Sequence, residues 1–279
     1  MLTLIATPIG NLKDISYRAV EALQEADAVF CEDTRHSLLL LNHLQIKKPL
    51  VSCHEHNERA RAEEMAALLK SGKNIAYISD AGMPGISDPG SILVETCIRE
   101  GLEYTVIPGA SAVLTAAVLS GYPCARFSFF GFLPRDNKER KEVLEELKLC
   151  RHMAILYESP HRVGTTLQLL KEEFGGDCRA ALMRELTKKF ETADRGTLEE
   201  LCERYREAEP KGECVLVLCC QDRKEENKEV DLDAEITEKL KEGLSVKDVA
   251  AVISEKYGMA KKNIYRRALE IKGDSNEEM

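Results

Sequence analysis

Short apolar runs alternate along the chain with longer segments in which apolar residues recur at helical spacing. The runs are rich in aliphatic and β-branched residues, and they are Leu2–Ala6, Ala28–Cys31, Ile75–Ser79, Tyr104–Pro108, Met153–Tyr157, Ala180–Met183 and Cys214–Cys220. Continuous apolar strands separated by helices are typical of α/β proteins whose sheets are covered on both faces. The pattern therefore predicts an α/β fold.

Two of the segments between these runs have clear helical faces. Their apolar members are Val163, Leu167 and Leu170 in the first segment, and Leu198, Leu201 and Tyr205 in the second. The second segment follows a T-x-x-E sequence at Thr197 and Glu200, which is typical of a capping box at a helix start. A third helix, highly charged, is predicted over Lys138–Leu149.

Breaks in the pattern predict three parts. Glycine and proline interrupt an aromatic-rich stretch around Ser120–Asp136, so we place a domain boundary near residue 118. After Cys220 the chain becomes polar and loses apolar periodicity, which favours a linker. The predicted parts are an N-terminal α/β domain over 1–118, a second α/β domain over 119–222, and a linker with a helical tail over 223–279.

The tail is expected to form two short helices around a turn. The first starts at a Ser245-x-x-Asp248 cap and has apolar positions before Gly258, and the second has four apolar positions. These positions are Val246, Val249, Ala250 and Ile253, then Ile264, Tyr265, Ala268 and Leu269. Such a pair resembles a helix-turn-helix, although any helical hairpin has a similar pattern.

Composition narrows the class of protein. The chain has 48 acidic and 39 basic side chains, a net charge of −9, and no apolar run near the roughly 18 residues of a membrane span. The apolar N-terminal residues follow no basic region, so we expect a buried strand rather than a signal peptide, and a soluble cytoplasmic protein. The negative total argues against a general nucleic-acid binder. Between Lys256 and Lys272, however, six basic residues stand against one acid.

The ten cysteines are scattered and include no C-x-x-C pair, so they are expected to be reduced, buried side chains rather than zinc ligands. The sharpest metal candidate is Cys53-His54-Glu55-His56, whose alternative interpretation is a polar loop after a strand. We expect no metal site.

The segment Asp80–Gly90 is the most informative part of the chain. It follows the strand Ile75–Ser79 and holds three glycines and two prolines, a composition that suits an uncovered backbone over which a ligand lies. The chain has no phosphate-binding G-x-G-x-x-G or G-x-x-x-x-G-K-[ST] pattern. Because this loop carries acids and hydroxyls but no Lys or Arg, it favours an adenosine ligand with a cationic or zwitterionic tail, and S-adenosylmethionine is the common cofactor of that kind.

Two further loops resemble ligand loops, although each alone is compatible with an ordinary turn. Thr7–Leu12 follows the first strand, and Pro108–Ala112 opens a helix whose free N–H groups could hold a carboxylate.

Four polar clusters offer acids and cations for catalysis or phosphate binding. They are Glu32–His36, His54–Arg59, Glu158 with His161 and Arg162, and Arg184–Glu191. We interpret Asp33 or Glu185 as the general base. We expect Arg35, Arg162, Lys188 and Lys189 to bind RNA phosphates. For Glu32–His36, a helix start with favourably placed acids is an equal alternative.

Six ordered motifs carry a family resemblance. They are ATPIGNLKDIS, EDTR, SDAGMPGISDPG, PGASA, GFLPR and YESPHR. They resemble the small-subunit rRNA methyltransferases of the tetrapyrrole-methylase-like superfamily, which act on a cytidine 2′-oxygen in 16S rRNA. The sequence Ala6–Asn11 keeps only one glycine of the superfamily's usual first loop, which favours the rRNA branch over porphyrin or corrin methylases.

The resemblance implies two α/β domains of the tetrapyrrole methylase type, with S-adenosylmethionine in a cleft between them, and a homodimer. It also implies the cofactor contacts: Pro8, Asp80, Ala81, Gly82, Ile86, Ser87, Ser111, Ala112, Phe132, Leu133, Tyr157, Met183 and Gly212. The expected partner is 16S rRNA or the small ribosomal subunit. The alternatives are a tetrapyrrole or corrin methylase, and a nucleic-acid-binding regulator that senses a small molecule.

Overall fold

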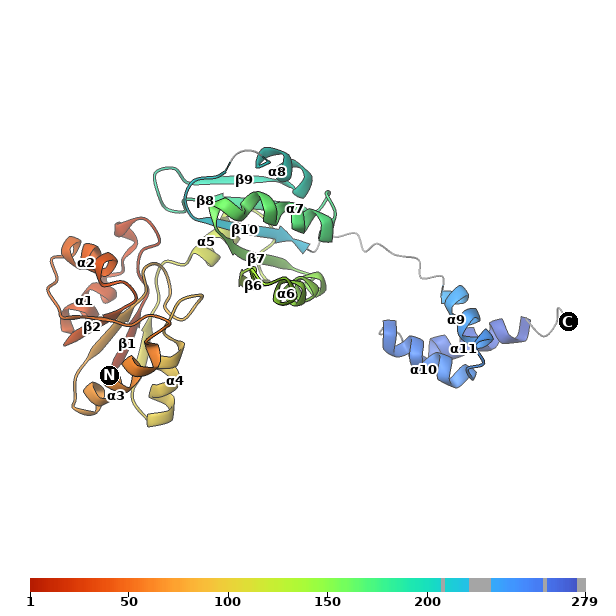
Figure 1. The fold of residues 1–279 in the computed structure, drawn as a ribbon, viewed down its shortest axis with the longest axis horizontal. Coiled ribbons are helices and arrows are strands. Elements are labelled where there is room, and N and C mark those ends of the chain that lie inside the picture. Colours follow the sequence, from red (N-terminus) through yellow and green to blue (C-terminus); the bar gives the residue numbers. More distant parts are fainter. Residues whose placement is uncertain (207–208, 221–231, 258–259, 275–279) are drawn as a thin grey trace. The chain divides into compact units, whose positions relative to one another are not determined.

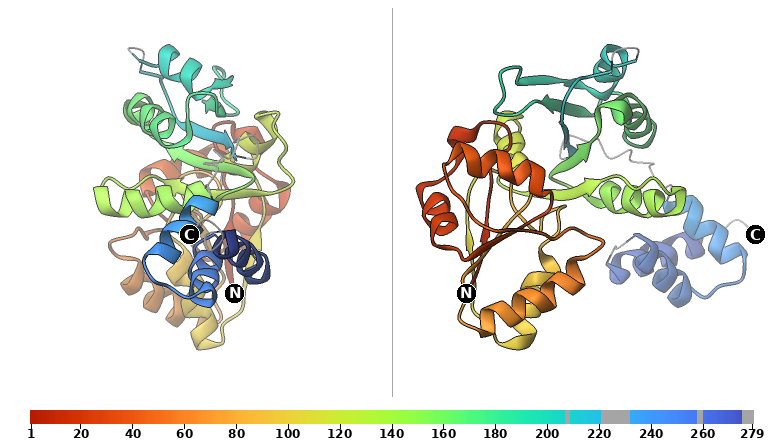
Figure 2. Two further views of the ribbon diagram at one scale, coloured as in Figure 1. Left: turned by 90° about the vertical axis from the view of Figure 1, so that its right-hand side faces the viewer. Right: turned by 60° about the vertical axis from the view of Figure 1, so that its left-hand side comes forward.

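The computed structural model describes residues 1–206, 209–220, 232–257 and 260–274 (Figure 1). The chain divides into two compact units, residues 1–222 and 223–279. The first unit contains two five-stranded sheets, each the centre of one lobe. In Figure 2 the first lobe runs from red to yellow and the second from green to teal.

The first lobe has a fully parallel sheet in the order β3-β2-β4-β1-β5. Its strands are β1 (Leu2–Ile5), β2 (Ala28–Cys31), β3 (Leu50–Ser52), β4 (Ile75–Ile78) and β5 (Tyr104–Ile107). Its helices are the short η1 (Leu12–Asp14), then α1 (Tyr17–Glu25), α2 (Thr34–His43), α3 (Glu58–Lys70) and α4 (Ser91–Glu100). Alternate strand residues pack against α1 and α2 on one face and against α3 and α4 on the other, so the sheet is covered on both faces.

The second lobe has a mixed sheet in the order β6-β7-β10-β8-β9, in which only β6 and β7 are parallel. Its strands are β6 (Phe127–Phe132), β7 (Met153–Glu158), β8 (Arg179–Arg184), β9 (Thr192–Thr197) and β10 (Cys214–Cys219). One face carries α6 (Asn137–Leu149), α7 (Val163–Phe174) and α8 (Leu198–Arg204), with the short η2 (Pro160–Arg162) before α7.

The opposite face of the second sheet is covered by α5 (Ala112–Leu119). Val113, Ala116 and Ala117 pack there against Ile155 and Val217 of the sheet. The changeover from the first sheet to the second therefore comes before α5, earlier in the chain than the expected boundary near residue 118. The reason is that α5 is apolar on nearly every side and buries its small side chains against the second sheet.

The apolar runs and helical faces of the sequence are found where they were predicted. Val163, Leu167 and Leu170 are fully buried on α7, and the capping box of Thr197 and Glu200 starts α8. Three strands were not predicted: β3 is only three residues long, β6 contains Gly131, and β9 has the polar sequence TADRGT. β3 and β9 are edge strands, which need fewer apolar residues than central ones.

The second unit contains α9 (Leu232–Lys241), α10 (Val246–Tyr257) and α11 (Lys261–Asp274) around an apolar core. The cap at Ser245 is present, because the Asp248 N–H donates to Ser245 Oγ over 3.2 Å. α9 lies at the end of the expected linker and was not predicted. Tyr265 and Leu269, expected among the apolar positions, are 42% and 48% exposed because they point away from this core, and Gly258 lies outside the described residues.

None of the helices in the described parts of the chain is long and apolar enough to span a membrane.

Candidate functional site

Three loops of the first lobe converge at the carboxyl ends of β1, β4 and β5. Thr7 and Gly82 form an antiparallel bridge, in which the Thr7 N–H donates to the Gly82 carbonyl over 2.9 Å and the Gly82 N–H donates back over 3.1 Å. A Cβ at Gly82 would lie 3.4 Å from Ile9 Cγ2 and 3.9 Å from the Ala110 oxygen. The segments Thr7–Leu12, Asp80–Gly90 and Pro108–Ala112 therefore form one surface at the edge where parallel sheets bind ligands.

The loop Asp80–Gly90 depends on its glycines for its path. Gly82, Gly85 and Gly90 have φ angles of +80°, +83° and +134°, a range that favours glycine, and Ser87 adopts +62°. At Gly90 a Cβ would also lie 3.0 Å from the Tyr77 ring. The loop is thus an irregular, tightly packed structure and not an extended linker.

A buried carboxylate anchors the end of this loop. Glu58 is 4% exposed, and its Oε1 accepts hydrogen bonds from the N–H groups of Gly90 over 2.7 Å and Ile92 over 3.1 Å. It therefore caps the start of α4 from a residue 32 positions earlier in the chain. The sequence placed Glu58 in a polar cluster but gave no signal for this contact.

Acidic side chains gather beside the same loop. The Asp33 N–H donates to Asp80 Oδ1 over 3.2 Å, which joins the end of β2 to the glycine-rich loop. Burial raises the pKa of Asp88 to about 6, with the carboxylates of Glu32 and Asp80 adding to the shift and the Ser79 hydroxyl opposing it. Burial, and then the charge of Asp80, also raise the pKa of Glu32. Neither Glu32 nor Asp88 was chosen from the sequence, because their burial arises only when β2 and β4 pair.

Asp33 is a weak proton acceptor in this arrangement. Its carboxylate caps α2 by accepting from the Arg35 N–H over 2.8 Å, and it pairs with the Arg35 guanidinium over 2.7 Å. Hydrogen bonds from Arg35 lower the pKa of Asp33 to about 2. The structure therefore supports the helix-start interpretation of Glu32–His36. The Arg35 side chain faces solvent, with one side of its guanidinium bound to Asp33.

An aromatic group from the second lobe faces the glycine-rich loop. The rings of Phe129 and Phe132 lie 4.8 and 5.5 Å from that of Tyr157, and Phe132 is 52% exposed. Burial raises the pKa of Tyr157 to about 12, with Asp88 as the next contribution. A Cβ at Gly131, one residue before Phe132, would lie 3.5 Å from Ser87 Oγ, so the two lobes meet here.

The remaining predicted cofactor residues differ in how accessible they are to a ligand. Ser111 caps α5 by accepting from the Leu114 N–H over 3.4 Å, with Ala112 next to it, whereas Pro8 is buried beside the Thr7 bridge. Met183 is fully buried in the core under α5. The Leu133 side chain is 1% exposed in the core on the opposite face of the second sheet, so only its backbone is available to a ligand. Ala81 is half-buried and Ile86 is 48% exposed.

Glu185 belongs to a strained loop after β8. Its Oε1 accepts from Lys188 Nζ over 3.0 Å and from the Glu213 N–H over 3.3 Å. Lys188 also pairs with Glu213 over 3.0 Å, so neither Glu185 nor Lys188 is a free group for a proton or a phosphate. Gly212 lies directly under the Glu185 carboxylate, where a Cβ would overlap it. These contacts give Glu185 a structural role.

The loop also joins the two lobes. Glu185 and Thr187 have φ angles of +52° and +64°, and such angles in residues other than glycine cost about 1–3 kcal/mol each. A Cβ at Gly10 would lie 2.5 Å from Lys188 Cγ and 2.9 Å from the Leu186 oxygen. The strained loop therefore packs directly on the backbone of the first ligand loop.

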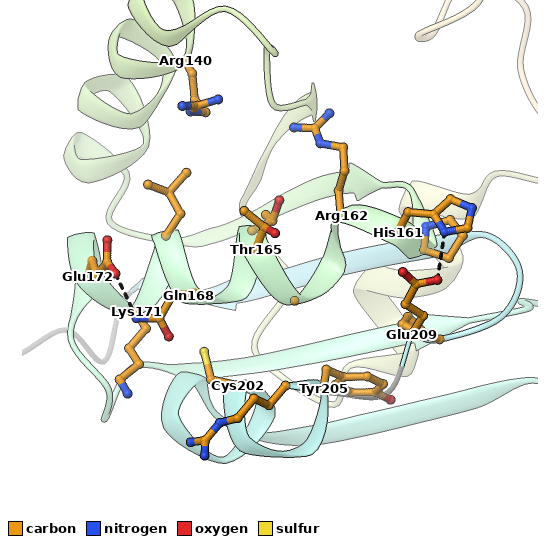
Figure 3. A pocket seen from close by; sticks show the side chains of 16 residues that line it. Arg140, His161, Arg162, Thr165, Gln168, Lys171, Glu172, Cys202, Tyr205 and Glu209 are labelled. Carbon is orange, nitrogen blue, oxygen red and sulfur yellow. Dashed lines mark hydrogen bonds and ion pairs between the residues drawn. The ribbon is translucent and has the colours of Figure 1, made fainter.

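Arg162 lies on another face. Its guanidinium donates to the Leu133 carbonyl over 2.9 Å and lies 3.5 Å from the fully buried carboxylate of Glu158. It lines a groove of about 780 Å³ between α6, α7 and α8, toward which Arg140 also extends (Figure 3). The pairing with Glu158 makes Arg162 part of the lobe's internal structure.

In the described parts of the chain no group of three or more His, Cys, Asp or Glu side chains could hold a metal ion. Nine of the ten cysteines are buried, as the sequence predicted, and Cys124 is half-buried.

Comparison with known proteins agrees with this geometry. A family model described as tetrapyrrole (corrin/porphyrin) methylases matches residues 1–202, and one described as the RsmI C-terminal HTH domain matches residues 226–272. Among solved structures, a diphthine synthase is similar with a TM-score of 0.63 and 20% identity, covering 78% of this chain and 89% of its own. A uroporphyrin-III-C-methyltransferase from Thermus thermophilus is similar with a TM-score of 0.55 and 21% identity, covering 79% and 94%.

Curated relatives are more similar in sequence. A ribosomal RNA small subunit methyltransferase I from Synechocystis is 41% identical over 98% of this chain and 99% of its own length. The protein of the same name from Halalkalibacterium halodurans is 47% identical over 82% of this chain and 79% of its own.

The two-lobed architecture and the family model define a methylase of the tetrapyrrole methylase family. Within that family, the chain belongs with the ribosomal RNA small subunit methyltransferase I proteins. The fold expected from the sequence is confirmed, and the cofactor of the family is S-adenosylmethionine.

The residues present fit that cofactor. The half-buried carboxylates of Glu32 and Asp88 suit its positive charge, the half-exposed ring of Phe132 suits its adenine, and the start of α5 suits its carboxylate.

Proposed function

We propose that the protein transfers a methyl group from S-adenosylmethionine to the ribose 2′-hydroxyl of a cytidine in 16S rRNA. The observation that carries this proposal is the extent of the similarity to the Synechocystis rRNA methyltransferase, which covers 98% of the chain and therefore includes the helical tail. The uroporphyrin methyltransferase structure covers only 79% of the chain. The match to this rRNA enzyme thus extends into the tail.

The two lobes would share the binding of the cofactor. Asp80 and Asp88 would place negative charge near its cationic groups, and Ser111 with the first N–H groups of α5 would hold its carboxylate. Phe132 and Tyr157 would provide the apolar wall. When bound, S-adenosylmethionine supplies an electrophilic methyl group on a sulfonium ion.

The chain's own contribution to the reaction is orientation and proton removal. A ribose hydroxyl is a poor nucleophile until it loses its proton, so a carboxylate at the reacting position would assist. Asp88 is better suited to this role than Asp33 or Glu185, because it is half-buried near the carboxylates of Glu32 and Asp80 and forms no ion pair with a cation among the described residues. The strained loop and Gly10 would keep the lobes in register so that the hydroxyl is held behind the methyl group.

Cations on the tail support an RNA partner. Lys256 pairs with Glu235 over 2.6 Å, and Arg267 pairs with Asp233 and Glu270. Lys261, Lys262 and Arg266 are exposed on α11 and form no ion pair with a described residue. These three cations would contact phosphates, while the acidic remainder of the chain would limit non-specific binding.

We infer that the active form is a cytoplasmic homodimer. Exposed apolar side chains on the edge strand β5 and on α5 support a partner surface, and they are Tyr104, Val106, Leu114 and Val118. Light scattering of Val118→Asp tests this surface, because a charge within it should yield monomers.

The functional test is transfer of radiolabelled methyl groups to unmethylated small subunits, to naked 16S rRNA and to a uroporphyrinogen acceptor. We expect label in rRNA, and none in the tetrapyrrole. Asp80→Ala should abolish binding of S-adenosylmethionine in calorimetry, and unchanged affinity would remove the glycine-rich loop from the cofactor site. Sequence-specific binding of duplex DNA with no label in rRNA would instead support a regulator.

A further inference from the structure

We propose that Phe190, with Lys189 beside it, is a stacking platform for one unpaired base of the RNA substrate. This inference rests on the proposed function and names a contact by which the RNA would be held at the site.

The side chain of Phe190 is exposed in a way that folding does not explain. It is 68% exposed near the end of the loop between β8 and β9, and its ring has the Lys189 ammonium 5.5 Å from its centroid. A large aromatic side chain so exposed contributes little to the core, whereas an aromatic face next to a cation is a common element of nucleic-acid binding surfaces.

Hydrogen bonds hold the backbone of this loop in place. The Thr187 N–H donates to Glu191 Oε2 over 2.7 Å, and the Glu191 N–H donates to the Lys188 carbonyl over 3.2 Å, so the chain is closed on both sides of Phe190. The Lys188 ammonium is fixed between Glu185 and Glu213. Non-glycine residues in left-handed conformations at Glu185 and Thr187 persist because these contacts support them. A platform fixed in advance loses less entropy when a base binds.

The platform lies beside the ligand loops. Lys188, two residues before Phe190, packs on Gly10, which directly follows the Thr7-Pro8-Ile9 segment that bridges to the glycine-rich loop. Glu185 begins the same loop immediately after β8, whose Met183 belongs to the apolar core against which Tyr157 also packs. A base stacked on Phe190 would therefore bring its strand to the edge where the lobes meet.

The chemistry of Phe190 and Lys189 indicates which ligand would bind there. Every base has a π-face that stacks on an aromatic ring, and the phosphate joined to it is complementary to the charge of Lys189, which is exposed and forms no ion pair with a described residue. Base-paired RNA hides its π-faces, so the occupant is a nucleotide in a single-stranded segment.

The absence of tryptophan from the chain provides a sharp experiment. Phe190→Trp creates a single fluorophore at the platform, and titration with an unstructured oligocytidylate should quench its emission saturably. Phe127→Trp is the matched control, since Phe127 is also partly exposed but starts β6, at the opposite end of that strand from Phe132. We expect little quenching in the control.

Activity provides the second readout. Phe190→Ala should raise the KM for RNA about tenfold, with unchanged affinity for S-adenosylmethionine, and Phe190→Trp should restore it. Equal emission changes in both tryptophan variants would overturn the proposal. An emission change in Phe190→Trp that depends on protein concentration and not on RNA concentration would also overturn it, because Phe190 would then contact a second copy of the chain. Saturable quenching of Phe190→Trp by RNA, together with wild-type protein that never methylates rRNA, would refute the proposed function alone.

Discussion

The Glu58 carboxylate on α3 accepts a 2.7 Å hydrogen bond from the Gly90 N–H, at the point where the glycine-rich loop enters α4. Gly90 has a φ of +134°, and a Cβ there would lie 3.0 Å from the Tyr77 ring, so the hydrogen bond fixes a conformation that residues other than glycine would not prefer. A side chain outside the loop thus determines the loop's shape.

Glu58→Ala should destabilise the protein and weaken cofactor binding together. The substitution leaves the N–H groups of Gly90 and Ile92 without their acceptor in a buried environment, at a cost of about 1–3 kcal/mol each. Urea denaturation measures the loss in the free energy of unfolding. Glu63→Ala, at an exposed position of the same helix, is the control and should change stability by less than about 0.5 kcal/mol.

The two acids Asp33 and Asp88 should respond to pH in opposite ways. The pKa of Asp33 is lowered to about 2, so its stabilising contribution is present above its unfolded pKa and is lost as pH falls toward 2. The pKa of Asp88 is raised to about 6, so the folded state binds the extra proton, and stability falls as pH rises from about 4 to 6.

If Asp88 accepts the proton, methyl transfer should decline below about pH 6. Asp88→Asn should lower kcat and remove that acidic limb of the pH profile, whereas Asp33→Asn should leave the limb in place. A profile of Asp88→Asn with the wild-type limb would exclude Asp88 as the titrating group.

Gly212→Ala should lower the stability of the protein by more than the strain of its backbone angle alone explains. Gly212 and Gly72 both have a φ of +85°, but a Cβ at Gly72 meets nothing within 4 Å, whereas one at Gly212 overlaps the Glu185 carboxylate. We expect Gly72→Ala to lose about 1 kcal/mol from strain, and Gly212→Ala to lose at least about 2 kcal/mol more because the Lys188 network must move. Equal losses in thermal unfolding would show that the network is not rigid.

Neutralising Lys261, Lys262 and Arg266 together should weaken RNA binding at low salt. Three lost phosphate contacts should reduce the slope of log affinity against log salt by about two, since each contact contributes about 0.7 for single strands. Lys239→Ala, which removes a cation already paired with Glu242, is the control and should leave the slope unchanged.

Local composition was sufficient to predict the loops but not the side chains that act in them. The glycines and prolines of Asp80–Gly90 predicted an irregular loop after β4 from adjacent residues alone, and its binding of a ligand stays a prediction. The burial of Asp88 and the contact of Glu58 depend on residues far apart in sequence, which no local pattern records. Asp33 was chosen as a base from its residue type, but Arg35, two positions later, lowers its proton affinity.

Packing between residues far apart in sequence was likewise not predictable from local patterns. Apolar runs located the central strands, whereas the polar edge strand β9 is held by its antiparallel partner β8. Leu133 was expected at the cofactor because it belongs to the GFLPR motif. Its side chain instead faces the core formed with the helices, whereas Phe132 faces the ligand loops.

The central claim is methylation of a ribose hydroxyl in rRNA, and nucleoside mass spectrometry tests it most directly. Unmethylated small subunits incubated with the purified protein and S-adenosylmethionine, then digested to nucleosides, should yield 2′-O-methylcytidine, and the Asp80→Ala protein should yield none. The account would be contradicted by a methyl group on a base. It would also be contradicted if protein that binds S-adenosylmethionine yielded no methylated nucleoside.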